Sequence, residues 1–225
     1  MNLGNFLLID ASSPDSTAVG LLDARGRAWS AFVEEKSPAL EGIFSAVEKV
    51  EKLSGTFPPS GFIFCAGPGS ILGIRIAAMA IRGWLALGLR VPVLSFRSLS
   101  LHTALILRSR ENEKNFAVLA ESRMNCWNAL RVRDGVAEEN FREIKSADLA
   151  DALPEKIFLL PQRRKIPPPV RDVPELFRPA EFLANDAAVF ADVPELLADC
   201  TGLPDAVNVS AAETYAKWSP ERHRA

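Results

Sequence analysis

Residues 64–99 read FCAGPGSILGIRIAAMAIRGWLALGLRVPVLSFRSL, and the order of elements in this segment indicates the fold class. Its first residues continue a short apolar run at 62–66, which predicts a strand. A glycine-rich loop at 67–70 leads into a long helix over about residues 71–87. A second strand is predicted at 91–95, where Pro92 excludes a continued helix. This order of strand, loop, helix and strand is typical of an α/β domain.

The segments before this stretch complete one domain. Apolar runs at 6–9, 17–22 and 27–33 predict a three-strand meander, with a loop of hairpin length at 23–26. Ser37 and Pro38 then supply a helix start, followed by apolar residues at helical spacing up to Val50. With a further helix around 99–107, the elements predict an RNase H-like domain: a mixed five-stranded sheet with flanking helices.

The second half of the chain partly repeats this order. Strands are expected at 116–120, 126–132, 136–144 and 157–160, with a short helix opened by Ser146 before the last of them. The pattern therefore predicts a duplicated, two-lobed fold of the actin-like ATPase type.

The polar segment 108–115 separates an N-terminal lobe at 1–110 from a smaller lobe at 111–200. Prolines accumulate between 161 and 179 beside the basic residues 163–165, which indicates an irregular loop. In the tail at 201–225, Tyr215 and Trp218 predict docking back onto a lobe.

Composition limits the classes of function. The net charge of −2 provides no global positive field, so a nucleic acid would be held only indirectly, by another protein. Cys65, Cys126 and Cys200 form no CxxC pair, which fits reduced thiols in the cytoplasm and argues against a metal site. The N-terminus has no basic region of the kind that begins a signal peptide. Arginines interrupt the apolar stretch at 71–96, so no membrane span is expected.

The glycine-rich loop matches neither of the common phosphate-binding motifs. A P-loop requires lysine directly after its last glycine, but Gly73 is followed by Ile74, and GxGxxG would require glycine at Leu72. Two interpretations stay open: a tight turn capped by Ser70, or an anion or partner site at the helix start. The candidate residues for such a site are Asp10, Gly67, Pro68, Gly69, Ser70, Gly73 and Arg75.

Catalytic residues are scarce in this chain. Only two histidines occur, His102 and His223, so no HExxH pair can hold a metal. Asp10 lies at the end of the first strand, where actin-like kinases and ATPases keep a metal-associated carboxylate, but Ala-Ser-Ser follows it. We therefore expect a turn or capping role for Asp10, with a stand-alone ATP-binding phosphotransferase or ATPase as the alternative. No catalytic residue and no metal ligand is assigned.

Three segments resemble the TsaB (YeaZ) family of tRNA threonylcarbamoyladenosine synthesis. They are LLIDASS at 7–13, the segment at 64–99 and AETYAKW at 212–218. The first resembles the family's AIDTS pattern, and the second resembles its GPGSFTGLRIG and IPLVGVSSL patterns. Ile71 and Leu72 replace the family's usual Phe-Thr, and ESRMNCW at 121–127 stands where relatives show DARRGEVY. The chain is therefore identified as a divergent member.

The resemblance implies a non-catalytic scaffold. Such a protein would bind TsaD, which holds the metal and nucleotide, and with the ATPase TsaE would support threonylcarbamoyl transfer to the tRNA adenosine beside the anticodon. Related scaffolds can also form homodimers, and none of these roles requires a cofactor bound by this chain alone. Small residues along the helix at 71–87 suit close helix packing, which predicts a partner interface at Ala78, Arg82 and Leu85.

Overall fold

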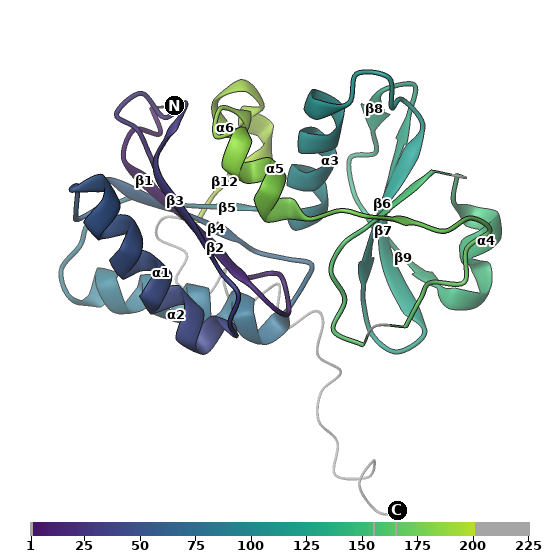
Figure 1. Cartoon of the computed structure of the whole chain (residues 1–225), viewed down its shortest axis with the longest axis horizontal. Coiled ribbons are helices and arrows are strands. Elements are labelled where there is room, and N and C mark those ends of the chain that lie inside the picture. The colour runs from purple at the N-terminus through teal and green to yellow at the C-terminus, as the bar shows by residue number, and fades with distance from the viewer. Residues whose placement is uncertain (1, 155, 165, 201–225) are drawn as a thin grey trace, which may run out of the picture.

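The computed structural model describes residues 2–154, 156–164 and 166–200, and these fold into two lobes that each contain one mixed sheet (Figure 1). In the first sheet the strand order is β12-β5-β4-β1-β2-β3. Its strands and main helices are β1 (Phe6–Asp10), β2 (Thr17–Leu22), β3 (Trp29–Glu35), β4 (Gly61–Cys65), β5 (Val93–Phe96), β12 (Ala198–Asp199), α1 (Ala39–Ser54), α2 (Ile71–Ala86) and α3 (Ser98–Ser109).

The predicted strands and helices of the first lobe are present, with small shifts in their ends. β1, β2 and β3 form the expected antiparallel meander, while β1, β4 and β5 run parallel. Every residue of β1 and β4 is buried, as expected of central strands covered on both faces. Pro38, in an extended conformation, takes the N-cap position that was expected for Ser37, so α1 begins at Ala39.

The first sheet has a sixth strand, which corrects the predicted five. β12 pairs antiparallel with β5, and the Cys200 N–H donates to the Val93 carbonyl oxygen at 2.8 Å. The preceding helices α5 (Pro179–Asn185) and α6 (Val189–Asp192) lie between the lobes (Figure 1). Residues 198–199, expected in the second lobe, thus join the first sheet. A two-residue strand carries no sequence periodicity, so only long-range pairing reveals it. The expected docking of the tail at 201–225 lies outside the described residues.

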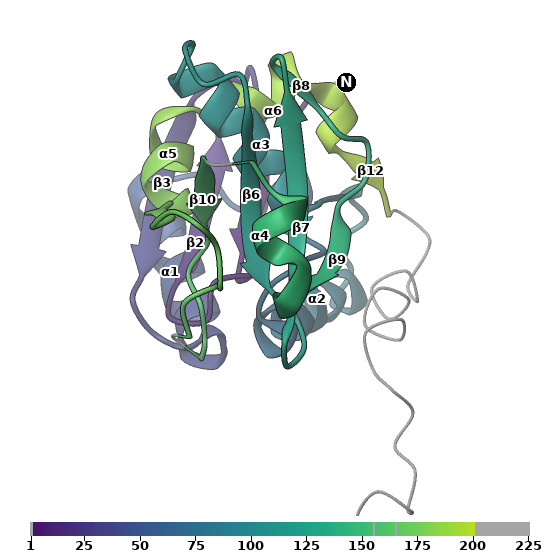
Figure 2. The same cartoon turned by 90° about the vertical axis from the view of Figure 1, so that its right-hand side faces the viewer.

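The second sheet repeats the pairing of the first. Its elements are β6 (Phe116–Glu121), β7 (Cys126–Arg133), β8 (Val136–Ala137), β9 (Arg142–Lys145), β10 (Ile157–Leu159), β11 (Glu175–Leu176) and the short helix α4 (Leu149–Ala152). β6 pairs antiparallel with β7 and parallel with β10, as β1 does with β2 and β4 (Figure 2). This recurrence confirms the duplicated fold.

The strand expected at 136–144 is broken into β8 and β9. Between them, the Glu138 carboxylate forms an ion pair with Arg131 at 2.6 Å. The proline-rich segment, expected to be irregular, includes the short edge strand β11.

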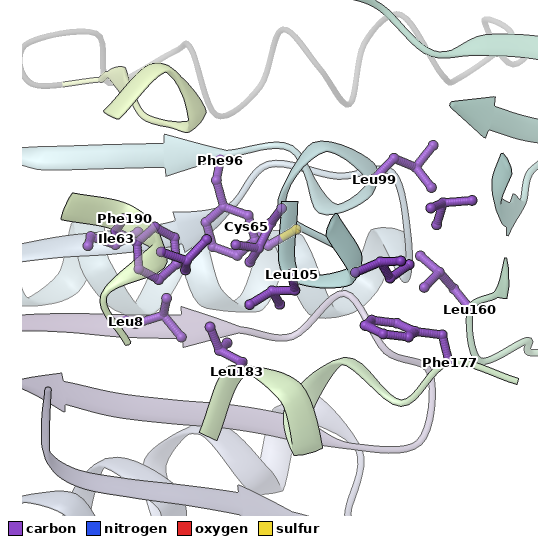
Figure 3. Close-up of a cluster of buried hydrophobic side chains, with 14 of the residues drawn as sticks. Leu8, Ile63, Cys65, Phe96, Leu99, Leu105, Leu160, Phe177, Leu183 and Phe190 are labelled. Carbon is purple, nitrogen blue, oxygen red and sulfur yellow. The ribbon is translucent and has the colours of Figure 1, made fainter. Parts of the chain in front are cut away.

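Two hydrophobic clusters cover opposite faces of the first sheet. One lies beneath α1 and α2 and stays within the first lobe. The other extends from Leu8 and Phe96 through α3 to Phe158 and Phe177 of the second lobe (Figure 3). The lobes therefore share one continuous core. No helix in the described residues is long and apolar enough to cross a bilayer.

Polar contacts fasten α5 and α6 against the first lobe. The Trp29 Nε1–H donates to the Leu183 carbonyl oxygen at 2.8 Å. Arg108 at the end of α3 bonds Asp186 at 3.0 Å and Asp192 at 2.9 Å. These contacts hold the returning chain against β3 and α3, between the two sheets.

Replacing Trp29 by phenylalanine is expected to lower the free energy of unfolding by about 1 to 2 kcal/mol. The aromatic packing against Phe32 (5.2 Å between centroids) is largely kept, but the Leu183 carbonyl loses the indole donor and keeps only the Asp186 N–H at 3.2 Å. Urea denaturation measures the effect. An unchanged transition midpoint would show that water replaces this bond without loss.

Candidate functional site

The glycine loop packs directly against the end of β1. Because β1 and β4 are parallel neighbours, their carboxyl ends, Asp10 and Cys65, meet at one edge of the sheet. The Ser70 N–H donates to the Ser12 carbonyl oxygen at 2.7 Å. A Cβ at Gly69 would lie 2.5 Å from that same oxygen, and one at Gly73 would lie 2.1 Å from the Ala11 carbonyl oxygen. Both glycines are therefore required by close backbone packing.

The polar groups of the loop bond to other parts of the protein. Ser70 is the N-cap of α2, and its hydroxyl accepts the Gly73 N–H at 3.3 Å. The Gly67 carbonyl accepts the Ser98 N–H at 2.9 Å, and the Pro68 carbonyl accepts the Ser98 hydroxyl. The loop thus joins β4, α2 and α3, which supports the interpretation as a tight structural turn.

Asp10 is enclosed by this turn. It is only 7% exposed, and its Oδ1 accepts the Ser12 N–H at 2.9 Å. Burial raises the pKa of its carboxyl, and the hydrogen bonds from Ser12 counteract part of that rise. Burial and the nearby Asp10 charge also raise the pKa of the Cys65 thiol well above its usual value. This geometry supports a capping role for Asp10, and it makes Cys65 a poor nucleophile.

Replacing Asp10 by asparagine is expected to stabilise the protein at pH 7. The amide oxygen keeps the acceptor for the Ser12 N–H, while the buried charge disappears. Since the folded pKa of Asp10 is raised, the ionised form destabilises the fold above that pKa, and the destabilisation vanishes in acid. Urea denaturation at pH 7 checks this, with Asp10→Ala, which leaves the N–H unpaired, as the destabilised control. A less stable asparagine variant would contradict it.

His102 lies in the core and not at a surface. Its side chain is on α3, 1% exposed, and neither ring nitrogen has a hydrogen-bond partner among the described residues. The ring lies 5.9 Å from the ring of Phe177, and burial lowers its pKa to about 3. His102 therefore stays neutral at physiological pH and is buried in the core, so it is not available at the protein surface. The other histidine, His223, lies outside the described residues.

Only one of the three residues predicted for a partner interface is exposed. Ala78 is 1% exposed within the cluster beneath α2, and Leu85 packs partly against it. The assignment of Ala78 is therefore wrong, and a charged residue there would disrupt the core. Arg82 is exposed, as is Arg75 in the first turn. The error arose because α2 is apolar around most of its circumference, so its pattern does not reveal the outward face.

The outward side of α1 and α2 forms an apolar surface that sequence reasoning missed. Leu72 (68% exposed), Met79 (65%) and Leu87 (86%) come from α2 and its C-cap. α1, which lies beside α2 (Figure 1), adds Leu40 and Phe44, whose ring is 6.1 Å from that of Trp84. We call these residues, together with Gly83, the α1–α2 face. Exposed apolar residues gathered in this way are typical of an interaction surface.

The structure resembles that of YeaZ from Pseudomonas aeruginosa. The TM-score is 0.63 at 20% sequence identity, and the match covers 88% of this chain and 97% of that one. The chain has the YeaZ fold. An uncharacterized protein described as similar to peptidase YeaZ from Pseudomonas aeruginosa matches at a TM-score of 0.61, with 20% identity, over 88% of this chain and 96% of that one. Sequence comparison found no matching family model and no matching curated protein. The predicted two-lobed fold is thus confirmed.

Proposed function

We propose that this chain is a non-catalytic scaffold of the TsaB type, which binds a TsaD-like catalytic subunit through the α1–α2 face. With a TsaE-like ATPase, the complex would transfer threonylcarbamoyl to the tRNA adenosine beside the anticodon. The YeaZ fold and the family-like segments at 7–13 and 64–99 support this proposal.

The observation that carries the proposal is the exposed α1–α2 face. Three large apolar side chains of α2 and its C-cap, Leu72, Met79 and Leu87, lie more than 60% exposed. In water this exposure is unfavourable by about 25 cal/mol for each Å² of apolar surface, which a partner would recover by covering it. A standard interface buries about 800 Å² per partner, an area that two neighbouring helices can supply.

The chemistry is assigned to the partner. Asp10 and Cys65 are buried against the loop at 67–70 and bond to neighbouring groups of the same chain, so ATP and metal are proposed to bind the TsaD-like subunit. The chain's net charge of −2 favours tRNA contact through that subunit as well. A cytoplasmic location is part of the same proposal.

Size-exclusion chromatography and calorimetry with the TsaD-like protein of the same organism test the interaction. A complex at micromolar concentration is expected. Met79→Glu should weaken it about tenfold or more, because a charge replaces an exposed apolar contact, without unfolding the chain. Val136→Glu, at an exposed apolar position of the second lobe, is the matched control. Absence of a complex, or equal effects of the two variants, would contradict the proposal.

Titration with Mg-ATP separates the scaffold from the alternative of a stand-alone phosphotransferase. The scaffold alone should give no binding heat. Micromolar binding that is lost in Asp10→Asn would instead favour the enzyme.

A further inference from the structure

One segment of the chain has a strong charge asymmetry. Residues 52–110 contain no Asp or Glu but seven cations, although the whole chain carries a net charge of −2. They are Lys52, Arg75, Arg82, Arg90, Arg97, Arg108 and Arg110. Three of them pair with carboxylates from outside the segment: Lys52 with Glu48, Arg108 with Asp186 and Asp192, and Arg110 with Glu175.

Two cations near α2, Arg82 and Arg90, differ from these three paired residues. Arg82 and Arg90 are exposed, and neither has an ion-pair partner among the residues that the structure describes. α2 itself contains no carboxylate at all. The charges of Arg82 and Arg90 are therefore not neutralised within α2, whereas the exposed carboxylates of this face, Glu41, Glu48 and Glu51, all lie on α1.

The basic and apolar positions alternate along the outward side of α2. Leu72, Arg75, Met79 and Arg82 follow one another at spacings of three and four residues, so they form one exposed row. Met79 thus lies between two arginines, and Leu87 continues the apolar surface past the last turn. A ligand for this row needs apolar groups with negative charge beside them that meets Arg82.

Gly83 provides a point of close approach on the same side. It is exposed, and a Cβ built there meets no atom of the described part of the chain within 4 Å. In a helix interior, glycine costs about 1 kcal/mol relative to alanine, and no contact with the residues that the structure describes requires Gly83. A glycine at this position would let another backbone or a bulky side chain come close to α2.

We propose that the α1–α2 face binds an amphipathic helix of the partner whose apolar stripe is flanked by Asp or Glu, and that Arg82 and Arg90 select this helix over a second copy of the chain. The inference rests on the proposed function, since it describes the surface that the TsaD-like subunit must present. It adds the sign of the charge on the partner's helix, and it gives the reason why this helix is bound in preference to a second copy of the chain.

Charge complementarity decides between the two occupants. A symmetric dimer that joins α2 to its own copy across Gly83 brings Arg82 near Arg82 of that copy, and like charges in such contacts are unfavourable. An acidic helix meets the same arginines with attraction, which accelerates association at low ionic strength.

The first test measures association of the full chain with the TsaD-like subunit at about 50 and 300 mM salt, across which screening changes strongly. Arg82→Glu/Arg90→Glu should slow association about tenfold at low salt and remove its salt dependence. Arg25→Glu/Arg133→Glu, the same change of charge at exposed positions away from α2, should behave like the wild type. If both double variants behave alike while the wild type binds, the charge inference is wrong and the proposed function stands.

The second test does not depend on that subunit. Two synthetic amphipathic helices with one apolar stripe, flanked by Glu or by Lys, are titrated into the full chain and followed by fluorescence anisotropy. The Glu helix should bind about tenfold more tightly, and the Arg82→Glu/Arg90→Glu variant should reverse this preference. Equal binding, or no binding of either helix at millimolar concentration, would overturn the inference. The inference would also be overturned if sedimentation analysis showed that the wild-type chain forms a dimer and that the Gly83→Leu substitution dissociates this dimer.

Discussion

Replacing Gly73 by alanine is expected to lower the free energy of unfolding by about 3 kcal/mol, although alanine is the better helix former. The new methyl group would lie 2.1 Å from the Ala11 carbonyl oxygen, a separation that no rotamer change can relieve. Either the first turn of α2 or the segment after β1 must move. Such a movement would disturb the Ser70–Ser12 hydrogen bond, which joins the two segments at 2.7 Å. Urea denaturation measures the loss.

Gly83→Ala is the matched control on the same helix. Within residues 2–154, 156–164 and 166–200, no atom lies within 4 Å of its added Cβ, so only the gain in helix propensity remains, and stability should rise by about 1 kcal/mol. Effects of the same sign at Gly73 and Gly83 would contradict the packing at the helix start.

Acidification from pH 7 to pH 4 is expected to cost the wild-type protein about 3 kcal/mol more than it costs the His102→Leu variant. The pKa of His102 is about 3 in the folded protein, against about 6.5 in an unfolded chain. Below pH 6.5 the unfolded state therefore takes up a proton that the folded state refuses, and stability falls until about pH 3. Each pH unit in this window corresponds to about 1.4 kcal/mol.

The comparison with His102→Leu isolates this contribution. Asp10, whose folded pKa is raised, acts in the opposite direction on acidification, but it is the same in both proteins. Leucine also removes two buried nitrogens that lack partners, so the variant should be at least as stable at pH 7. Urea denaturation of both proteins at pH 7 and pH 4 provides the difference. Parallel losses would show that His102 gains a proton in the folded state.

The two-lobed fold could be predicted because its signals are local. Apolar runs ended by turn residues identified the strands, and Ser70 with its glycines identified the start of α2. The repeated order of elements indicated the second lobe before any strand pairing was known. The position of Asp10 at the end of β1 followed from the same patterns.

The order of the elements and the turn at residues 67–70 follow from the amino-acid sequence alone, because backbone propensity and short-range periodicity depend on neighbours along the chain. Three other features become evident only in the folded protein: β12 joins the first sheet, His102 is buried, and Met79 faces outward while Ala78 does not. These outcomes depend on contacts between distant residues. For α2 in particular, apolar residues around most of the helix make every face suitable for burial, so the position of the sheet and of α1 selects which one stays exposed.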